Sequence, residues 1–218
     1  MAAYQRTAAG RLRVFAAVRA GEEAEGRVRV GEGASLDGMV ARAPQQWARL
    51  AGFFYLVNTV TSLSSFSGKL RGAVLTWSNW TATAAYVTVV ILLYLLFRPG
   101  SRWLSAVAAI FGLIGCADEA LWKYNLFPVH VHSLVFFGFY CTLLGVLILR
   151  SEFMPRLLGG LLLLAGAGWL TFVSANLSKM CSPYNYIAGG VGEIPLMLWL
   201  LIAGVNGERW RRQAGEVR

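Results

Sequence analysis

The chain has 218 residues, of which 56% are hydrophobic and only 14% are charged. Soluble domains carry charges on about a quarter of their residues, so this composition excludes an ordinary soluble enzyme or binding domain. The formal net charge of +9 would suit nucleic-acid binding, but the arginines gather at the ends of apolar stretches. Membrane orientation and anionic lipid headgroups explain arginines in such places. We therefore expect the lipid bilayer as a partner, and no nucleic acid.

Residues 1–46 differ from the rest of the chain, because they are rich in Arg, Glu, Gly and Ala and lack a sustained apolar run. This composition favours a disordered tail over a short basic helix at the membrane surface. No signal peptide is expected, since no uninterrupted apolar segment follows the first arginines. Met39 lies shortly before the first apolar stretch and offers an alternative start. We therefore expect residues 1–38 to be dispensable.

Six apolar stretches follow, each close to the roughly 20 residues that an α-helix needs to cross a bilayer. Lipid offers no partners to open strand edges, so these stretches must be helices. The connections are short, which predicts that consecutive helices are antiparallel neighbours. The fold class is therefore all-α, a polytopic transmembrane bundle over residues 47–206 with a basic tail over 207–218. The six predicted spans cover about 49–66, 75–97, 102–121, 129–149, 157–176 and 187–205.

The positions of Lys and Arg predict how this bundle sits in the membrane. Most of the 20 lie in the two tails and in the 98–102 and 150–156 junctions, and few lie in the alternate loops. The positive-inside rule then places both termini in the cytoplasm. Tryptophans near the span ends suit the two membrane interfaces. These are Trp103 and Trp210 on the inner side and Trp77, Trp80 and Trp122 on the outer side.

Small residues in the fifth predicted span indicate close helix packing. Gly159 and Gly160 come first, and alternating Ala and Gly follow over 165–168. Without large side chains between them, helix backbones can approach closely in lipid.

Polar residues are distributed unevenly along the spans. The predicted cytoplasmic halves are nearly pure hydrocarbon, whereas the outer halves carry amide, hydroxyl and ionisable side chains. Residues that recur every three or four positions share one helix face. Such polar faces are more often contacts between helices than ligand sites. The two faces are Tyr55, Asn58, Thr61, Ser62 and Ser65 in the first span, and Asn79, Thr83 and Tyr86 in the second.

Glu193 is the sharpest candidate for a functional residue. Ionisable groups at membrane depth are costly and turn toward partners or water. Pro195 removes a helix N–H and frees the carbonyl of Val191, which adds a polar notch beside the carboxylate. We expect Glu193 to face the bundle, with His130 or His132 as its nearest titratable neighbour. It would act there either as part of a ligand site or as a structural link between helices.

A metal site is not the favoured interpretation of these residues. His130 and His132 are about 200° apart on a regular helix, so both cannot bind one metal ion. A site built from one histidine, Glu193 and Asp118 is conceivable but less expected. Cofactors are left open. The candidate ligand-binding residues are Glu193, His130, His132, Asp118, Asn58, Asn79 and Tyr55.

Several segments of the second half carry a family resemblance. The most specific are Met154-Pro155-Arg156-Leu157-Leu158-Gly159 and the Gly192-Glu193 pair before Leu198-Trp199-Leu200-Leu201. With the Phe136–Cys141 run, they resemble the bacterial integral-membrane family called domain of unknown function 4386. The resemblance covers roughly 48–206 and is strongest from 130 onward. It implies a multi-span protein of the bacterial plasma membrane and brings no established activity.

Three functions follow from these observations. The first is a protein that binds a small molecule or lipid in a polar pocket open to the outer leaflet, in a sensor or accessory role. The second is a small-solute transporter, which would need a polar path through the apolar cytoplasmic half. The third is a hydrolase acting on a lipid headgroup through Glu193 and a histidine. Catalysis ranks last, because no nucleophile or metal-ligand motif accompanies the carboxylate.

Overall fold

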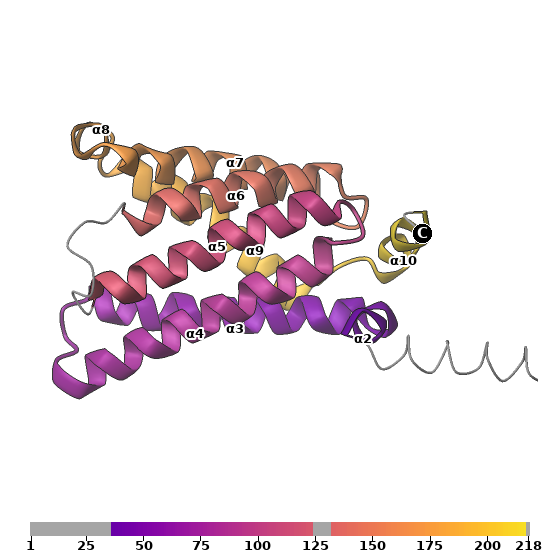
Figure 1. The fold of residues 1–218 in the computed structure, drawn as a ribbon, viewed down its shortest axis with the longest axis horizontal. Coiled ribbons are helices and arrows are strands. Elements are labelled where there is room, and N and C mark those ends of the chain that lie inside the picture. The colour runs from indigo at the N-terminus through magenta and orange to yellow at the C-terminus, as the bar shows by residue number, and fades with distance from the viewer. Residues whose placement is uncertain (1–35, 124–131, 217–218) are drawn as a thin grey trace, which may run out of the picture. The chain divides into compact units, whose positions relative to one another are not determined.

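The computed structural model describes residues 36–123 and 132–216, and every regular element in these ranges is helical (Figure 1). Helix α2 (Leu36–Arg42) belongs to one compact unit, and residues 43–218 form another. Of the predicted disordered tail, residues 1–35 lie outside the described residues, whereas Leu36–Arg42 is helical. The dispensability of residues 1–38 stays a prediction.

The second unit is built from six long helices with a short helical connection and a C-terminal helix. A 3₁₀ turn, η1 (Thr171–Val173), and the short helix α8 (Ala175–Met180) lie between the last two long helices. Helix α10 (Gly207–Glu216) ends the described chain. The long helices are α3 (Pro44–Phe66), α4 (Gly72–Phe97), α5 (Arg102–Lys123), α6 (Ser133–Arg150), α7 (Arg156–Leu170) and α9 (Tyr184–Ile202).

The chain is a multi-pass membrane protein. Five of its described helices, α4, α5, α6, α7 (with η1) and α9, are long and apolar enough to cross a bilayer. Helix α3 has 23 residues, or about 35 Å at 1.5 Å per residue, which exceeds the roughly 30 Å hydrocarbon layer. It is too polar to count among the five, because Asn, Ser and Thr fill its second half. A sixth span over 49–66 therefore stays a prediction.

The six long helices form a closed ring in chain order. Each packs chiefly against its two neighbours, from α3 through α4, α5, α6 and α7 to α9, and α9 packs back against α3. Figure 1 shows α4, α5 and α6 along the near side, with α3 and α9 behind them. Consecutive helices are antiparallel, as the short connections predict. The ring brings the last long helix beside the first.

Small residues set the closest helix approaches, which supports the packing prediction for the fifth span. A Cβ added at Gly159 of α7 would lie 2.8 Å from the carbonyl oxygen of Gly145 in α6. One added at Gly166 would lie 2.9 Å from the carbonyl oxygen of Gly138. Gly160, by contrast, has nothing within 4 Å of an added Cβ. The contact between α6 and α7 therefore depends on one face of α7 being free of side chains.

Helix α10 lies across one end of the ring, here called the α10 end. The indole Nε1 of Trp210 donates to the carbonyl of Leu96 in the last turn of α4 at 2.7 Å. Arg209 donates to the carbonyl of Glu152 between α6 and α7 at 3.3 Å. The C-terminal segment predicted as a basic tail thus forms a helix that ties the end of α4 to the connection between α6 and α7.

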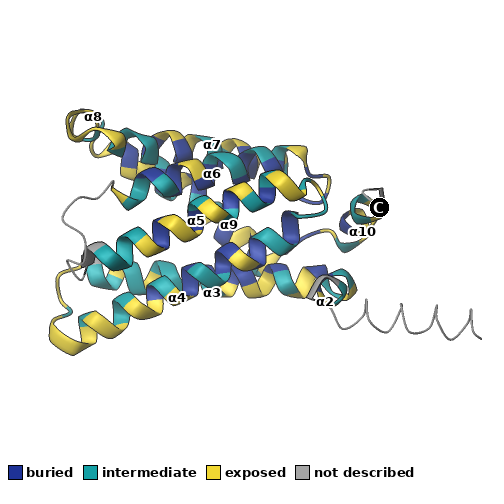
Figure 2. Ribbon diagram, in the orientation of Figure 1, coloured by how far each residue is buried: buried dark blue, intermediate teal, exposed yellow. Residues whose placement is uncertain are grey.

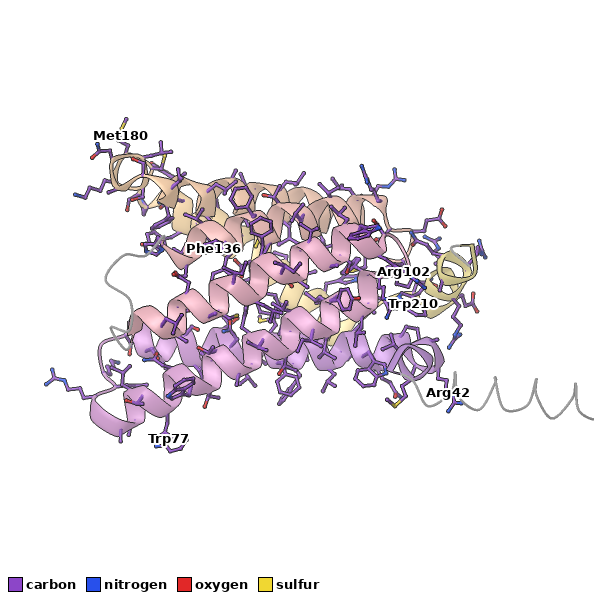
Figure 3. The ribbon with its side chains drawn as sticks, viewed as in Figure 1. Arg42, Trp77, Arg102, Phe136, Met180 and Trp210 are labelled. Carbon is purple, nitrogen blue, oxygen red and sulfur yellow. The ribbon has the colours of Figure 1, made fainter. Side chains whose placement is uncertain are left out.

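Trp210 corrects the expectation of an interfacial anchor. Only 3% of its surface is exposed, because its ring packs inward and its N–H satisfies a helix-end carbonyl. Trp103 and Trp77, with 85% and 72% of their surfaces exposed, are placed as interface anchors should be. Figure 3 shows Trp77 pointing away from the bundle and Trp210 turned toward it.

Burial divides the ring into two parts (Figure 2). From the α10 end to the level of Tyr55 and Tyr86, apolar side chains fill the interior; we call this part the sealed half. The buried polar Ser105 in this half donates to the carbonyl of Tyr94 at 2.9 Å. Apolar residues with 1% or less of their surface exposed include Ala48, Val89, Val90, Leu93, Leu96, Ile148, Leu162, Leu196 and Leu200.

The opposite ends of α3 and α4 are packed differently. Among the described side chains, none in 56–65 of α3 or 72–81 of α4 is buried. Burial in α4 begins at Ala82, and in α3 it ends at Tyr55. We call residues 56–65 and 72–81 the hairpin tip, since α3 and α4 pair there with each other.

The predicted span boundaries agree with most helices and fail at one. The fifth span was expected to run to residue 176, but α7 ends at Leu170 and continues as η1. The extended backbone of Ser174 then separates η1 from α8. The first three residues predicted for the fourth span, 129–131, lie outside the described residues.

Candidate functional site

Glu193 of α9 is the centre of a polar cluster that joins four helices. Its Oε2 accepts a hydrogen bond from the Tyr55 hydroxyl of α3 at 2.5 Å. Its Oε1 accepts from the indole Nε1 of Trp169 in α7 at 2.6 Å and from the Cys141 thiol of α6 at 3.8 Å. A carboxylate held by short bonds from two or more donors is strongly stabilised and fixed in orientation. Glu193 faces the bundle, as its charge predicts.

The neighbours of Glu193 differ from those expected. His132 caps the N-terminus of α6, where its Nδ1 accepts from the backbone N–H of Leu134 at 3.4 Å. Cys141 lies nine residues farther along the same helix, which is about 13 Å along its axis. The prediction that a histidine is the nearest titratable neighbour of Glu193 is therefore wrong for His132. His130 lies outside the described residues.

The physical reason lies in the depth at which each side chain enters. Glu193 is nine residues into α9, or about 13 Å from the start of that helix. His132 instead stays at the exposed start of α6, with its ring centroid 4.8 Å from that of Phe172. Both residues lie toward the same end of the bundle, but His132 stays near the surface while Glu193 lies deeper, so the two side chains do not meet.

Aromatic rings from α3, α4 and α6 pack against one another, and Tyr55 links them to the carboxylate. The ring of Tyr55 lies edge-on to that of Tyr86, with centroids 5.7 Å apart. Tyr86 in turn contacts Phe137 at 5.0 Å and Tyr140 at 6.2 Å. These rings fill the middle of the helix ring at the level of Glu193. We call Tyr55, Tyr86, Phe137 and Tyr140 the aromatic floor of the polar cluster.

One member of this floor has an unusual polar atom. The Tyr140 hydroxyl is buried and finds no hydrogen-bond partner among the described residues. Only 3% of the Tyr140 surface is exposed. A buried hydroxyl without a partner costs free energy, on the order of 1–3 kcal/mol, so such atoms need an explanation. A ligand or a water molecule that reaches this level would supply one.

The other predicted site residues that the structure describes lie outside this cluster, in the hairpin tip or on other helices. Asn58, one turn beyond Tyr55, donates to the carbonyl of Ala82 in α4 at 3.1 Å. Asn79 is half-buried in the hairpin tip, and its backbone carbonyl accepts a hydrogen bond from the hydroxyl of Thr83 at 3.1 Å. Asp118 is half-buried near the end of α5. Of the predicted set, the structure brings Tyr55 into contact with Glu193.

The hydroxyl stripe of the first helix is largely a set of structural contacts. Thr61 and Ser65 donate to backbone carbonyls one turn back in α3. The Ser65 hydroxyl also lies 3.2 Å from the Ser78 hydroxyl of α4, within hydrogen-bond distance, and this contact ties the two helices of the hairpin tip together. This agrees with the interpretation of such stripes as contacts between helices. An open hollow of about 650 Å³ lies farther along the tip, against Ala73, Thr76, Trp77 and Trp80.

The His, Cys, Asp and Glu side chains in the described part of the chain are the possible ligands of a metal site. No group of three or more His, Cys, Asp or Glu side chains gathers there in a way that could hold an ion. Cys116, Cys141 and Cys181 are free thiols. The cluster at Glu193 offers one carboxylate and three neutral donors, which is not the donor set of a common metal site.

Sequence reasoning missed Trp169 and undervalued Cys141. A signal for Trp169 was present: it lies inside a span, whereas membrane tryptophans gather at the interfaces. An indole N–H at depth needs an acceptor, and Glu193 is one of the few carboxylates within the apolar spans that could provide one. The position of Cys141 gave no comparable signal, because a buried thiol behaves as a small apolar group.

Comparisons with known proteins agree with the family resemblance. The sequence model of a family described as Domain of unknown function (DUF4386) matches residues 124–204. An uncharacterized protein of Archaeoglobus fulgidus is 30% identical over 127 residues, which span 54% of this chain and 76% of that relative. No solved structure matches. The segment that the family model matches includes Cys141, Trp169 and Glu193, but not Tyr55.

Proposed function

The chain belongs to the family of domain of unknown function 4386, whose description supplies no activity, and we propose a function from the contacts themselves. The protein binds a small molecule or lipid between its helices, with Glu193 at the bottom of the site. The observation that carries this proposal is the Tyr55–Glu193 hydrogen bond. It lies at the level where burial in α3 ends and the hairpin tip begins.

Access supports binding from the hairpin-tip side. Glu193 is half-buried, and both of its side-chain oxygens accept hydrogen bonds. Beyond Tyr55, α3 and α4 have no buried side chain among the described residues of the tip. A ligand that enters between the tip and the neighbouring helices would meet amides and hydroxyls first and the carboxylate last.

The sealed half favours binding over transport. A transported solute would have to pass Val89, Leu93 and Leu196, each with 1% or less of its surface exposed. Alternating access needs a polar path on both sides of the site. Hydrolysis through Glu193 and His132 is disfavoured, because His132 stays at the start of α6, away from the carboxylate. A sensor or accessory role suits a site with one entrance.

The proposal includes an orientation. Exposed arginines gather at the α10 end, and the positive-inside rule would place that end in the cytoplasm. The site would then open toward the outer leaflet of a bacterial plasma membrane. The arginines in question are Arg49, Arg102, Arg150, Arg156, Arg209, Arg211 and Arg212.

Cysteine labelling tests both the entrance and the orientation. In a chain with Cys116, Cys141 and Cys181 replaced by serine, single cysteines are placed at Ser62 and Asn79 of the tip or at Leu93 of the sealed half. A membrane-impermeant maleimide added to intact cells should label the two tip positions and leave position 93 unlabelled. Labelling of position 93, or no labelling at the tip, would overturn the proposal. Lysed cells and the denatured protein control for reagent access.

A further inference from the structure

The aromatic side chains near Glu193 form two connected groups. Tyr55, Tyr86, Phe137 and Tyr140 make the floor described above. On the other side, the Trp169 ring lies 6.2 Å from Phe172 and 6.0 Å from Tyr186. Trp169 donates its N–H to Glu193, and its ring packs closely against Gly189 of α9. The carboxylate is thus placed between aromatic rings from α3 and α7.

The second group reaches the surface of the bundle. Tyr186 has 46% of its surface exposed, and its ring lies 5.3 Å from that of Phe172. Phe172 also contacts the exposed His132 at 4.8 Å. A continuous series of rings therefore runs from an exposed position to the carboxylate.

Charge complementarity identifies the kind of molecule that suits such a site. Aromatic faces carry partial negative charge and attract cations, most strongly where water is excluded. An ionised Glu193 would add a full negative charge to the same place. An anion would be repelled by both features, and a neutral molecule would gain nothing from the charge.

The Tyr140 hydroxyl is a second and independent indication of a ligand. It is buried and without a hydrogen-bond partner among the described residues, next in sequence to the thiol that contacts Glu193. A hydroxyl oxygen can accept a hydrogen bond from an ammonium N–H. It can equally lie against the polarised C–H groups beside a quaternary centre.

We propose that the Glu193 site binds an organic cation, an amine or a quaternary centre with apolar substituents. The proposal rests on the proposed function and names the ligand class for the same site. The positive centre would lie against the Glu193 carboxylate and the faces of Tyr86 and Trp169. The apolar substituents would contact Phe137 and the hydrocarbon parts of the hairpin tip.

The test uses two probes of equal size and opposite charge. Tetraphenylphosphonium and tetraphenylborate are each dialysed to equilibrium against the purified full chain in detergent, with empty micelles subtracted. The cation should bind saturably, and the anion should not. Glu193→Gln keeps the shape and removes the charge, and it should weaken cation binding about tenfold or more. Glu208→Gln, which alters an exposed carboxylate on α10, should leave binding unchanged.

Two further variants separate charge from ring contacts. Tyr86→Phe keeps the ring and should retain cation binding, whereas Tyr86→Leu removes it and should weaken binding. Each variant is checked for a single gel-filtration peak and a cooperative melting transition. Should Glu193→Gln not fold, the comparison of the two probes on the unaltered chain still decides the matter.

Equal binding of both probes, or undiminished cation binding by a folded Glu193→Gln protein, would overturn the inference. The cysteine-labelling experiment makes this failure distinguishable from failure of the proposed function. A labelled tip with no preference for the cation would retain an open binding site and reject the ligand class. An unlabelled tip would reject the site itself.

Discussion

The sealed half and the hairpin tip share helices α3 and α4 but are held together in different ways. In the sealed half, glycine faces and large apolar side chains bring each helix against two neighbours. In the hairpin tip, α3 and α4 hold each other through hydroxyls and amides, as in the Ser65–Ser78 and Asn58–Ala82 bonds. Lipid is as apolar as leucine, so close packing rather than the hydrophobic effect stabilises the first region. We therefore expect the sealed half to contribute most of the stability and the hairpin tip to provide access to the site.

The largest effect is expected where helix backbones touch in the sealed half. In Gly159→Ala, the new Cβ would lie 2.8 Å from the Gly145 carbonyl oxygen and 2.8 Å from Leu149 Cγ. The backbone atom cannot move aside, so we expect a loss of about 3 kcal/mol in unfolding free energy. Gly160→Ala is the matched control on the next residue, where an added Cβ meets nothing within 4 Å. Equal melting temperatures in detergent for the two variants would contradict the packing account.

A leucine pair compares the two regions directly. Leu93 is 1% exposed in the sealed half, and Leu63 is 71% exposed in the tip. Leu93→Ala should lower the unfolding free energy by about 2 kcal/mol, because it leaves a cavity. Leu63→Ala should change it by less than about 0.5 kcal/mol. Chemical denaturation in mixed micelles measures both, and a larger loss for Leu63 would reverse the assignment of the two regions.

At the α10 end of the sealed half, the indole of Trp210 holds α10 against the last turn of α4. Trp210→Phe keeps an aromatic ring, although a smaller one, and removes the donor to the Leu96 carbonyl. Leaving that buried carbonyl without its partner should cost about 1 kcal/mol. Trp103→Phe, at a position 85% exposed, is the control and should be silent. Protection of α4 amides near residue 96 from hydrogen exchange should fall in the first variant and not in the second.

The smallest effect is expected in the hairpin tip. Ser65→Ala removes the hydroxyl contact to Ser78, and we expect a loss below about 0.5 kcal/mol. The same variant should leave cysteine labelling at position 79 unchanged, since the backbone of the tip is retained. A loss as large as that of Leu93→Ala would mean that the tip contributes to stability as much as the sealed half.

Much of this comparison could be predicted from the sequence. Composition predicted an all-helical membrane protein, and the polar stripes of α3 and α4 marked the region where burial ceases. The depth of Glu193 followed from its distance to the helix start. These properties depend on residues along one helix, whose periodicity is fixed by its geometry.

The partners of Glu193 could not be predicted in the same way. Tyr55 lies 138 positions away in the chain and meets Glu193 because α9 packs back against α3. Helical periodicity tells which residues share a face, but not how six helices are rotated about their axes. Trp169, Cys141 and the inward turn of Trp210 all depend on those rotations. The pairing of Glu193 with His132 failed for a different reason, because His132 stays at the start of α6 while Glu193 lies deeper in the bundle.

The closed ring has a consequence for how the protein is made. Helices leave the ribosome in chain order, and α3 to α7 can pair with their neighbours as each one emerges. Helix α3 must wait for α9 before its second flank is covered, so Tyr55 stays without Glu193 until the chain is almost complete. The Tyr55–Glu193 hydrogen bond can therefore form only after α9 has been synthesised and has packed against α3. A chain cut short before α9 would present the open flank of α3 to the quality-control machinery of the membrane.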